Sequence, residues 1–358
     1  MILLFLACTN PGPIEKAPID SGAPTTPDTS PTDSGPADSA TDAPCETDPA
    51  QPGEDITLSM EWEGRPRTWN VHLPVGYDCT PTPVVIGLHY YTGTAENFEH
   101  EVAQIHDWLD EHKVIGIFPN AMARGEGPDD NWITAFNDVS SHNDDGPDGA
   151  TCTSWAVDYG VFADCPASEA DRACFWGTSC ADDVGLVRAI IEQTSATWTV
   201  DPNRIHLTGF SQGAIATQTW AYELQDILAS VAPLHGFAAN GHTTAPTGDV
   251  SLMQVWGTYD YFINGWDTTS ADGLIYDGAE ETAEVWAEAQ GCSPVGDTPY
   301  PTVADDKWGW RCTEHAGCAT GTAVVQCQWD WTHDWGRDGA DNFMWDAVWE
   351  FFASHPRP

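Results

Sequence analysis

The sequence has very few basic residues. Twelve lysines and arginines stand against 55 aspartates and glutamates, and the formal net charge at pH 7 is −43. Proteins bind nucleic acids and anionic membrane surfaces largely through lysine and arginine, so neither is expected as a partner. Lysine occurs only at positions 16, 113 and 307. A surface this acidic suits saline surroundings, where salt screens the repulsion between like charges.

Beyond residue 8 the sequence also lacks any apolar run long enough to span a bilayer. Residues 1–8 are apolar and end in Ala7-Cys8, which resembles the end of a bacterial lipoprotein signal. A basic leading segment is missing, and the apolar stretch is about half the usual length. We expect residues 1–8 to be a truncated lipoprotein signal with a lipid on Cys8. The alternative is a chance apolar end.

Large apolar side chains are almost absent from residues 9–54, which consist mainly of Pro, Thr, Ser, Asp and Gly. Such a segment cannot bury enough surface to offset the entropy that is lost on ordering. We therefore expect a disordered tether over 9–54 and a folded domain over 55–358. The alternative for the tether is an ordinary secreted linker.

No two cysteines have the C-x2-C spacing of common zinc sites. If Cys8 carries a lipid, ten cysteines remain, an even number that permits five disulfides in an exported protein. We expect disulfides, with Cys312–Cys327 and Cys292–Cys318 as suggested pairs. Four other cysteines lie within residues 122–180, which are rich in Gly, Asp, Asn and Trp. We interpret this segment as a disulfide-pinned insertion that forms a lid or pocket wall.

Strand-like and helix-like runs alternate from residue 55 onward. The candidate strands, several of them continuously apolar as buried parallel strands are, cover residues 67–73, 83–90, 114–119, 205–210, 230–234, 251–256 and 323–331. Helical patterns cover 182–198, 214–224 and a closing segment around 345–352. This alternation predicts an α/β fold with a doubly wound, mostly parallel sheet.

The most informative motif is Gly209-Phe210-Ser211-Gln212-Gly213, a G-x-S-x-G pattern. It follows a predicted strand and opens a predicted helix, which is the context of a nucleophile elbow. Small residues on both sides of the serine permit the strained turn that exposes its hydroxyl. Ser211 is therefore the candidate nucleophile.

A serine nucleophile needs a base, and that base needs an acid to orient it. Asp260 and His333 each lie on a loop after a predicted strand, in the order serine, acid, histidine. We assign Asp260 as the orienting acid, with Asp267 as its rival. His333 is the proposed base, with His235 and His315 as alternatives.

An oxyanion that develops during acyl transfer needs backbone N–H donors. We expect one from Gln212, directly after the nucleophile, and one from Tyr91 in the loop after strand 83–90. The neighbouring Tyr90 is a candidate substrate-binding residue. The alternative is that both tyrosines are packing residues.

Residues 57–356 resemble the secreted polyhydroxybutyrate depolymerase and feruloyl esterase-type branch of the α/β-hydrolases. The resemblance is most specific over 182–236, and it also covers Arg67–Tyr77, Val84–His89, Gly257–Asp260 and Trp349–Phe352. It implies an α/β-hydrolase fold and a serine carboxylesterase or polyester depolymerase-type hydrolase that works through an acyl-enzyme, with a triad of Ser211, Asp260 and His333. The chain departs from the family at Tyr90 and Ala214, where the family has glycine, and at 330–332.

The substrate is expected to be an ester, in a polymer rather than a small molecule. Feruloyl or acetyl polysaccharide esters and polyhydroxyalkanoates are compatible, and an aromatic polyester would use the same chemistry. Flat aromatic faces stack on such ligands, and the candidates for the cleft are Trp132, Trp155, Trp176, Trp266 and Trp335. The alternatives are a serine peptidase on the same fold and a non-catalytic carbohydrate-binding lipoprotein.

No cofactor or metal is expected, and the protein is expected to be a monomer. His100, His106 and His112 recur every six residues, a spacing that would scatter them around a helix. Residues 143–148 offer hard oxygen ligands but lack the spacing and terminal glutamate of a calcium loop. We interpret that segment as a solvated acidic loop.

Overall fold

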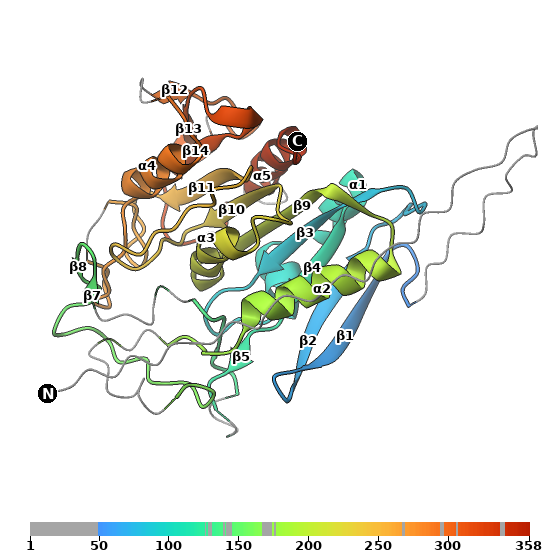
Figure 1. Cartoon of the computed structure of the whole chain (residues 1–358), viewed down its shortest axis with the longest axis horizontal. Coiled ribbons are helices and arrows are strands. Elements are labelled where there is room, and N and C mark those ends of the chain that lie inside the picture. The colour runs from blue at the N-terminus through green and yellow to red at the C-terminus, as the bar shows by residue number, and fades with distance from the viewer. Residues whose placement is uncertain are drawn as a thin grey trace, which may run out of the picture. The chain divides into compact units, whose positions relative to one another are not determined.

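A ten-stranded sheet forms the centre of the folded part (Figure 1). Its order is β1-β2-β4-β3-β9-β10-β11-β14-β13-β12, and the six strands from β4 to β14 run parallel, flanked by antiparallel strands at both edges. The strands are β1 (Glu54–Trp62), β2 (Arg65–Leu73), β3 (Thr82–Leu88), β4 (Ile115–Pro119), β9 (Val200–Phe210), β10 (Ser230–Leu234), β11 (Ser251–Gly257), β12 (Asp297–Pro299), β13 (Arg311–His315) and β14 (Val324–Trp329).

The computed structural model describes residues 49–125, 127, 131–138, 140, 145–166, 174, 177–266, 269–293, 297–305, 307–336 and 341–358. The predicted signal with Cys8, nearly all of the predicted tether, Trp176, Asp267 and residues 143 and 144 of the acidic loop lie outside these residues.

Helices cover both faces of the sheet. On one face α2 (Asp183–Thr197), α3 (Gln212–Glu223) and α4 (Ala279–Ala289) pack through Ile190, Trp220 and Trp286. On the other face, the π-helix η1 (Asn97–Val102), α1 (His106–His112) and α5 (Phe343–Ser354) pack through Phe98, Leu109 and Phe351. Among the described helices, none has the length and apolar character needed to cross a membrane. The predicted doubly wound α/β class is therefore confirmed.

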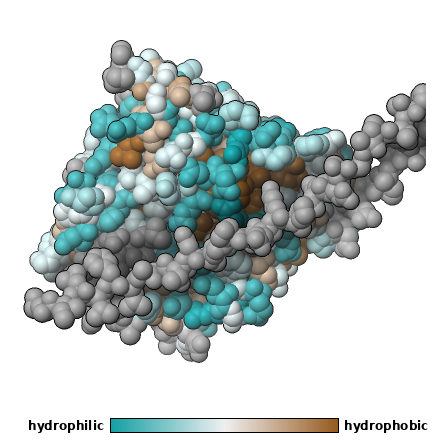
Figure 2. Space-filling model, in the orientation of Figure 1, coloured by the Kyte–Doolittle hydropathy of each residue, from teal (hydrophilic) through white to brown (hydrophobic). Residues whose placement is uncertain are grey.

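All seven predicted strands are present in the central sheet, and β1, β12 and β13, at or next to its edges, were missed. β3, β4, β10 and β11 are buried along their whole length, which is why their apolar runs identified them. β1 instead alternates between exposed and half-buried residues at the sheet edge. Edge strands with one solvated face give a weaker sequence signal. The molecular face in Figure 2 is correspondingly largely hydrophilic, with apolar residues confined to small areas.

The described residues of the predicted insertion over 122–180 include two short strand pairs. They are β5 (Met122–Ala123) with β6 (Thr134–Ala135) and β7 (Asp145–Gly146) with β8 (Gly149–Ala150). Two disulfides, Cys152–Cys174 and Cys165–Cys180, hold this segment, as expected. The suggested pairs Cys312–Cys327, which joins β13 to β14, and Cys292–Cys318 are also present.

Acid is expected to destabilise the fold through His206, which is fully buried on β9. Its Nδ1 lies 2.8 Å from Ser230 Oγ and its ring stacks on Phe352. Burial lowers its pKa to about 3. Below the ordinary histidine pKa of about 6.5, His206 is therefore protonated in the unfolded chain but stays neutral in the folded chain. The contribution of His206 to the free energy of unfolding is fully present above pH 6.5. It falls by about 1.4 kcal/mol per pH unit between pH 6.5 and 3.

Urea unfolding at pH 7, 5.5 and 4.5 measures this dependence, and the His206→Asn variant isolates the contribution of His206. Asparagine retains a polar group near Ser230 but does not titrate, so the variant should lose less stability on acidification than the wild type. Parallel pH dependences in the two proteins would contradict the assignment.

Candidate active site

Ser211 occupies a sharp turn between β9 and α3. Its φ of 58° and ψ of −122° are rare for a residue with a side chain. A Cβ on Gly209 would lie 2.3 Å from Gly213 O, and a Cβ on Gly213 would lie 2.4 Å from Leu88 O. Only glycine fits at both positions, so the two glycines of the motif make the strained serine turn possible.

The structure brings Ser211, His333 and Asp260 into one hydrogen-bonded line. His333 Nε2 lies 2.9 Å from Ser211 Oγ, and His333 Nδ1 lies 2.6 Å from Asp260 Oδ2. A carboxylate can only accept, so Nδ1 carries the proton and Nε2 is free to accept the Ser211 hydroxyl proton. This tautomer is the one that a general base requires.

Asp260 is almost completely buried at the C-terminal end of β11. Its Oδ1 accepts the backbone N–H groups of Phe262 and Ile263 at 2.9 and 3.0 Å. Burial alone would raise the pKa of Asp260, but hydrogen bonds from His235 and His333 outweigh it and hold the pKa well below its usual range. Asp260 therefore stays ionised and holds the His333 ring in place.

His235 contacts the same carboxylate from the interior. Its Nδ1 lies 3.1 Å from Asp260 Oδ2, while its Nε2 accepts the indole N–H of Trp329 at 3.1 Å. Both contacts fix a neutral imidazole with the proton on Nδ1, and burial lowers its pKa in agreement. His235 was considered in the sequence as a rival base. Its ring is completely buried and supports the acid instead.

Replacing His235 with leucine is expected to lower kcat about tenfold with little change in KM, because Asp260 loses one of its two histidine donors. His235→Asn should restore most of the loss, since its amide can still donate toward Asp260. Steady-state kinetics with p-nitrophenyl butyrate would measure both. Equal defects in the leucine and asparagine variants would indicate a packing role alone.

The loop after β3 is held close to the serine. His89 is buried, and burial lowers its pKa to about 4. Its Nδ1–H donates to Tyr90 O at 2.8 Å, and its Nε2 accepts Ala121 N–H at 3.1 Å. Within the part of the chain that the structure describes, the backbone N–H groups of Tyr91 and Gln212 donate to no protein acceptor. Both are therefore available to an oxyanion.

The Gln212 side chain braces the insertion against the elbow. Its Nε2 donates to Phe136 O at 2.9 Å, and its Oε1 accepts Phe136 N–H at 3.2 Å. Trp220, two turns along α3, donates its indole N–H to Asn137 O at 2.8 Å. The insertion is thus attached to the helix that carries the nucleophile.

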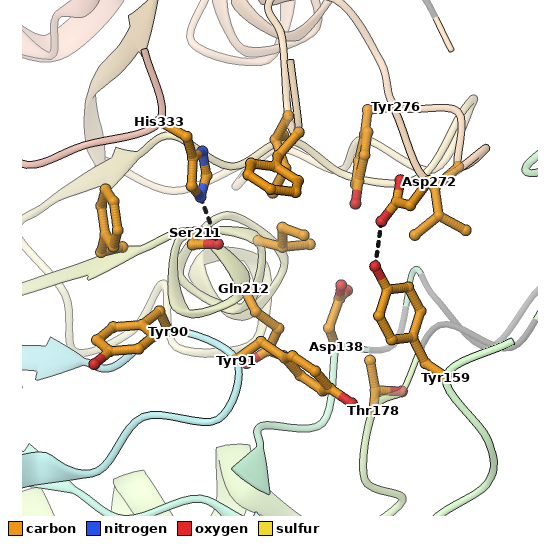
Figure 3. Close-up of a pocket in the computed structure, with 15 residues that line it drawn as sticks. Tyr90, Tyr91, Asp138, Tyr159, Thr178, Ser211, Gln212, Asp272, Tyr276 and His333 are labelled. Carbon is orange, nitrogen blue, oxygen red and sulfur yellow. Dashed lines mark hydrogen bonds between the residues drawn. The ribbon is translucent and has the colours of Figure 1, made fainter. Parts of the chain in front are cut away.

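A cavity of about 280 Å³ opens beside Ser211 (Figure 3). Ser211 and His333 lie on one side of it, and Tyr159, Asp272 and Tyr276 lie on the other. Tyr159 from the insertion donates its hydroxyl to Asp272 Oδ2 at 2.5 Å. The lining residues are Tyr90, Tyr91, Asp138, Tyr159, Thr178, Phe210, Ser211, Gln212, Ile215, Phe262, Ile263, Asp272, Leu274, Tyr276 and His333. The expected pocket wall from residues 122–180 is therefore present.

The predicted tryptophan cleft is not found among the described residues. Trp132, Trp155 and Trp266 are all more than half exposed and do not line this cavity. Trp335 is buried and packs edge-on against Phe98 and Phe210. Tyrosines line the cavity instead, including the predicted Tyr90 and Tyr91. Tyr159 and Tyr276 were missed because a tyrosine in a long irregular segment carries no positional signal.

Sequence comparisons identify esterases as relatives. No family model matches the chain. Feruloyl esterase B of Piromyces equi is 28% identical over 182 residues, which is 48% of this chain and 32% of that protein. A probable feruloyl esterase C of Aspergillus niger is 26% identical over 184 residues, 50% of this chain and 60% of that protein. The chain thus matches only part of the length of either relative.

Among solved structures, acetyl xylan esterase from Aspergillus awamori superposes with a TM-score of 0.53 at 13% identity. The match covers 84% of this chain and all of that one. It supports the α/β-hydrolase fold, whereas the resemblance to polyhydroxybutyrate depolymerases stays a prediction. The chain has the α/β-hydrolase fold and is similar in sequence to esterases of the feruloyl esterase type.

Proposed function

We propose that the protein is a serine carboxylester hydrolase that works through an acyl-enzyme. The observation that carries this proposal is the line from Ser211 Oγ through the His333 ring to Asp260, at the edge of a cavity with two free backbone N–H groups. The similarity to feruloyl esterases and to an acetyl xylan esterase supports the same reaction class.

In the proposed mechanism, His333 Nε2 removes the Ser211 hydroxyl proton as Oγ attacks the ester carbonyl. The negative charge that develops on the carbonyl oxygen is stabilised by the N–H groups of Gln212 and Tyr91. His333 then donates its proton to the departing alcohol oxygen. Water, activated by the same ring, hydrolyses the Ser211 ester and restores the free serine. Asp260 stabilises the imidazolium in both half-reactions.

The cavity favours an acyl group with a flat, apolar body and a polar group at the end remote from the ester. Phe210, Ile215 and Leu274 provide apolar surface, and the Tyr159–Asp272 pair lies opposite Ser211. A hydroxycinnamoyl group has this distribution, with its phenolic hydroxyl at the end remote from the ester. We therefore propose feruloyl-type esters of polysaccharides as the leading substrate class, with acetyl esters and polyesters as alternatives.

We propose that the protein is exported from the cytoplasm and acts outside it. Disulfides persist mainly in oxidising compartments, and four are formed within the described residues. A lipid on Cys8 and a polymeric substrate remain predictions.

Serine labelling tests the proposed function most directly. The oxidised protein and its Ser211→Ala variant would be treated with a fluorophosphonate probe, while hydrolysis of p-nitrophenyl butyrate and methyl ferulate is followed. Labelling and turnover of both esters should be lost in the variant. A folded wild-type protein that neither labels nor hydrolyses would contradict the proposal and favour a binding protein on a hydrolase scaffold.

Asp272→Asn is expected to reduce kcat/KM for methyl ferulate about tenfold, because the phenolic hydroxyl loses a charged acceptor. Methyl cinnamate lacks that hydroxyl and should be affected much less. The ratio of the two kcat/KM values is the measurement. An equal loss on both esters would place the phenolic group elsewhere.

A further inference from the structure

A second cluster of titratable side chains lies outside the active-site cavity. Glu99 and His100 on η1 and His106 at the start of α1 bring one carboxylate oxygen and two ring nitrogens within 4.8 Å of one another. The Glu99 side chain is 2% exposed, whereas that of His100 is 39% exposed, so the cluster opens to solvent on one side. None of the three lines the cavity beside Ser211.

The backbone between the two histidines explains why they meet. The six-residue spacing predicted that His100, His106 and His112 would be scattered around one helix, but the helix is interrupted. η1 ends at Val102, and Gln104 adopts a left-handed φ of 47° before α1 begins. The His100 and His106 rings are thereby brought to 4.2 Å between centroids. His112 lies elsewhere, and its ring packs against Trp349.

The distances within the cluster are those of ion pairs or of ligands around an ion rather than of hydrogen bonds. His100 Nε2 lies 3.7 Å from Glu99 Oε1, and His106 Nε2 lies 3.6 Å from Glu99 Oε2. Both separations exceed hydrogen-bond length. His106 Nε2 is buried without a hydrogen-bond partner among the described residues. Ligand atoms about 2.1 Å from a tetrahedral ion lie roughly 3.4 Å apart, so small side-chain rotations would complete the site.

Neighbouring polar groups orient two of these side chains. Asn70 on β2 donates to Glu99 Oε1 at 2.5 Å. Asp55 Oδ2 on β1 lies 3.3 Å from His106 Nδ1, the ring nitrogen that faces away from Glu99. A carboxylate behind a histidine is the usual support for a metal-bound imidazole, because it fixes the tautomer that leaves the other nitrogen free.

We propose that Glu99, His100 and His106 bind a divalent ion of the zinc class, with solvent as the fourth ligand on the open side of His100. Two imidazoles and one carboxylate suit zinc, whereas calcium and magnesium take oxygen ligands. The ion would join η1 to α1 and, through Asp55 and Asn70, to the β1–β2 hairpin. Its role is structural, because the mechanism proposed at Ser211 uses none of these residues.

Metal titration of the untagged full chain, stripped with a chelator and dialysed, tests this proposal. Zn²⁺ binding measured by calorimetry should give one ion per chain and raise Tm. Co²⁺ should give the visible absorption bands of a tetrahedral site with nitrogen and oxygen ligands. His100→Asn, at the exposed ligand, should abolish the Co²⁺ bands without unfolding the protein. Asp55→Asn should weaken Zn²⁺ binding by about 10–100-fold.

His112→Asn is the matched control, because it removes a histidine from the same segment that lies outside the cluster, and it should bind both ions like the wild type. Absence of Co²⁺ bands and of Zn²⁺ binding in the wild type would overturn the proposal. In that case the cluster would instead be a protonated His106 paired with the carboxylates of Asp55 and Glu99. Binding that persists unchanged in both His100→Asn and Glu99→Gln would overturn it as well.

Discussion

Replacing Asp260 with asparagine is expected to lower kcat by about 10⁴-fold while KM changes little. Oδ1 of Asp260 accepts two backbone N–H groups, and Oδ2 faces two histidine Nδ1 atoms. An asparagine that keeps its oxygen on the backbone side presents its NH₂ to both rings. His333 must then carry its proton on Nε2, where it can no longer accept the Ser211 hydroxyl proton.

Steady-state kinetics with p-nitrophenyl butyrate would measure this loss, and circular dichroism would verify the fold. Asp226→Asn is the control, because Asp226 is an exposed carboxylate that pairs with Arg188 and is not among the cavity residues. It should retain wild-type kcat. A loss of less than tenfold in Asp260→Asn would mean that Asp260 does not set the His333 tautomer.

Replacing Arg67 with methionine is expected to reduce the free energy of unfolding by about 3–5 kcal/mol. Arg67 on β2 forms a buried ion pair with Asp183, the first residue of α2, at 2.5 Å, and the two side chains are 3% and 1% exposed. Asp183 also accepts hydrogen bonds from Asn137 N–H at 2.7 Å and from the Ser179 hydroxyl at 3.3 Å. Two separate parts of the insertion therefore bond to the carboxylate that Arg67 of β2 neutralises. Methionine would leave this carboxylate buried without its cation.

Urea unfolding would measure the effect, with two comparison variants. Arg67→Met/Asp183→Asn should recover part of the stability, because no buried charge then remains. Arg188→Met breaks the exposed pair with Asp226, whose side chains are 34% and 62% exposed, and should cost less than about 1 kcal/mol. Equal costs for the Arg67 and Arg188 variants would show that burial of the first pair has no energetic consequence.

The positions of Ser211, Asp260 and His333 were predictable because each depends on local sequence. The strained elbow needs glycine at 209 and 213, and the acid and base each follow a strand that is legible from its apolar run. In a parallel sheet the carboxyl ends of successive strands meet at one edge. The parallel pairing of β9, β10, β11 and β14 therefore brings the three side chains together at one edge of the sheet.

The cavity wall was not predictable in the same way. A tryptophan can lie in a ligand cleft, in the core or on the surface, and its sequence position does not distinguish these environments. Trp335 packs in the core against Phe98, whereas Tyr159 reaches the cavity and donates its hydroxyl to Asp272. Such contacts join residues more than a hundred positions apart.

Short stretches of sequence were enough to predict the fold class, the order of the candidate catalytic residues and the presence of disulfides. These follow from periodicity, glycine sterics and composition, which are properties of short segments. Three features emerged only from the folded structure: His235 shares Asp260 with His333, His100 and His106 meet where the helix is interrupted, and tyrosines line the cavity. The physical reason is that burial and long-range contacts, rather than residue type, set the role of each of these side chains.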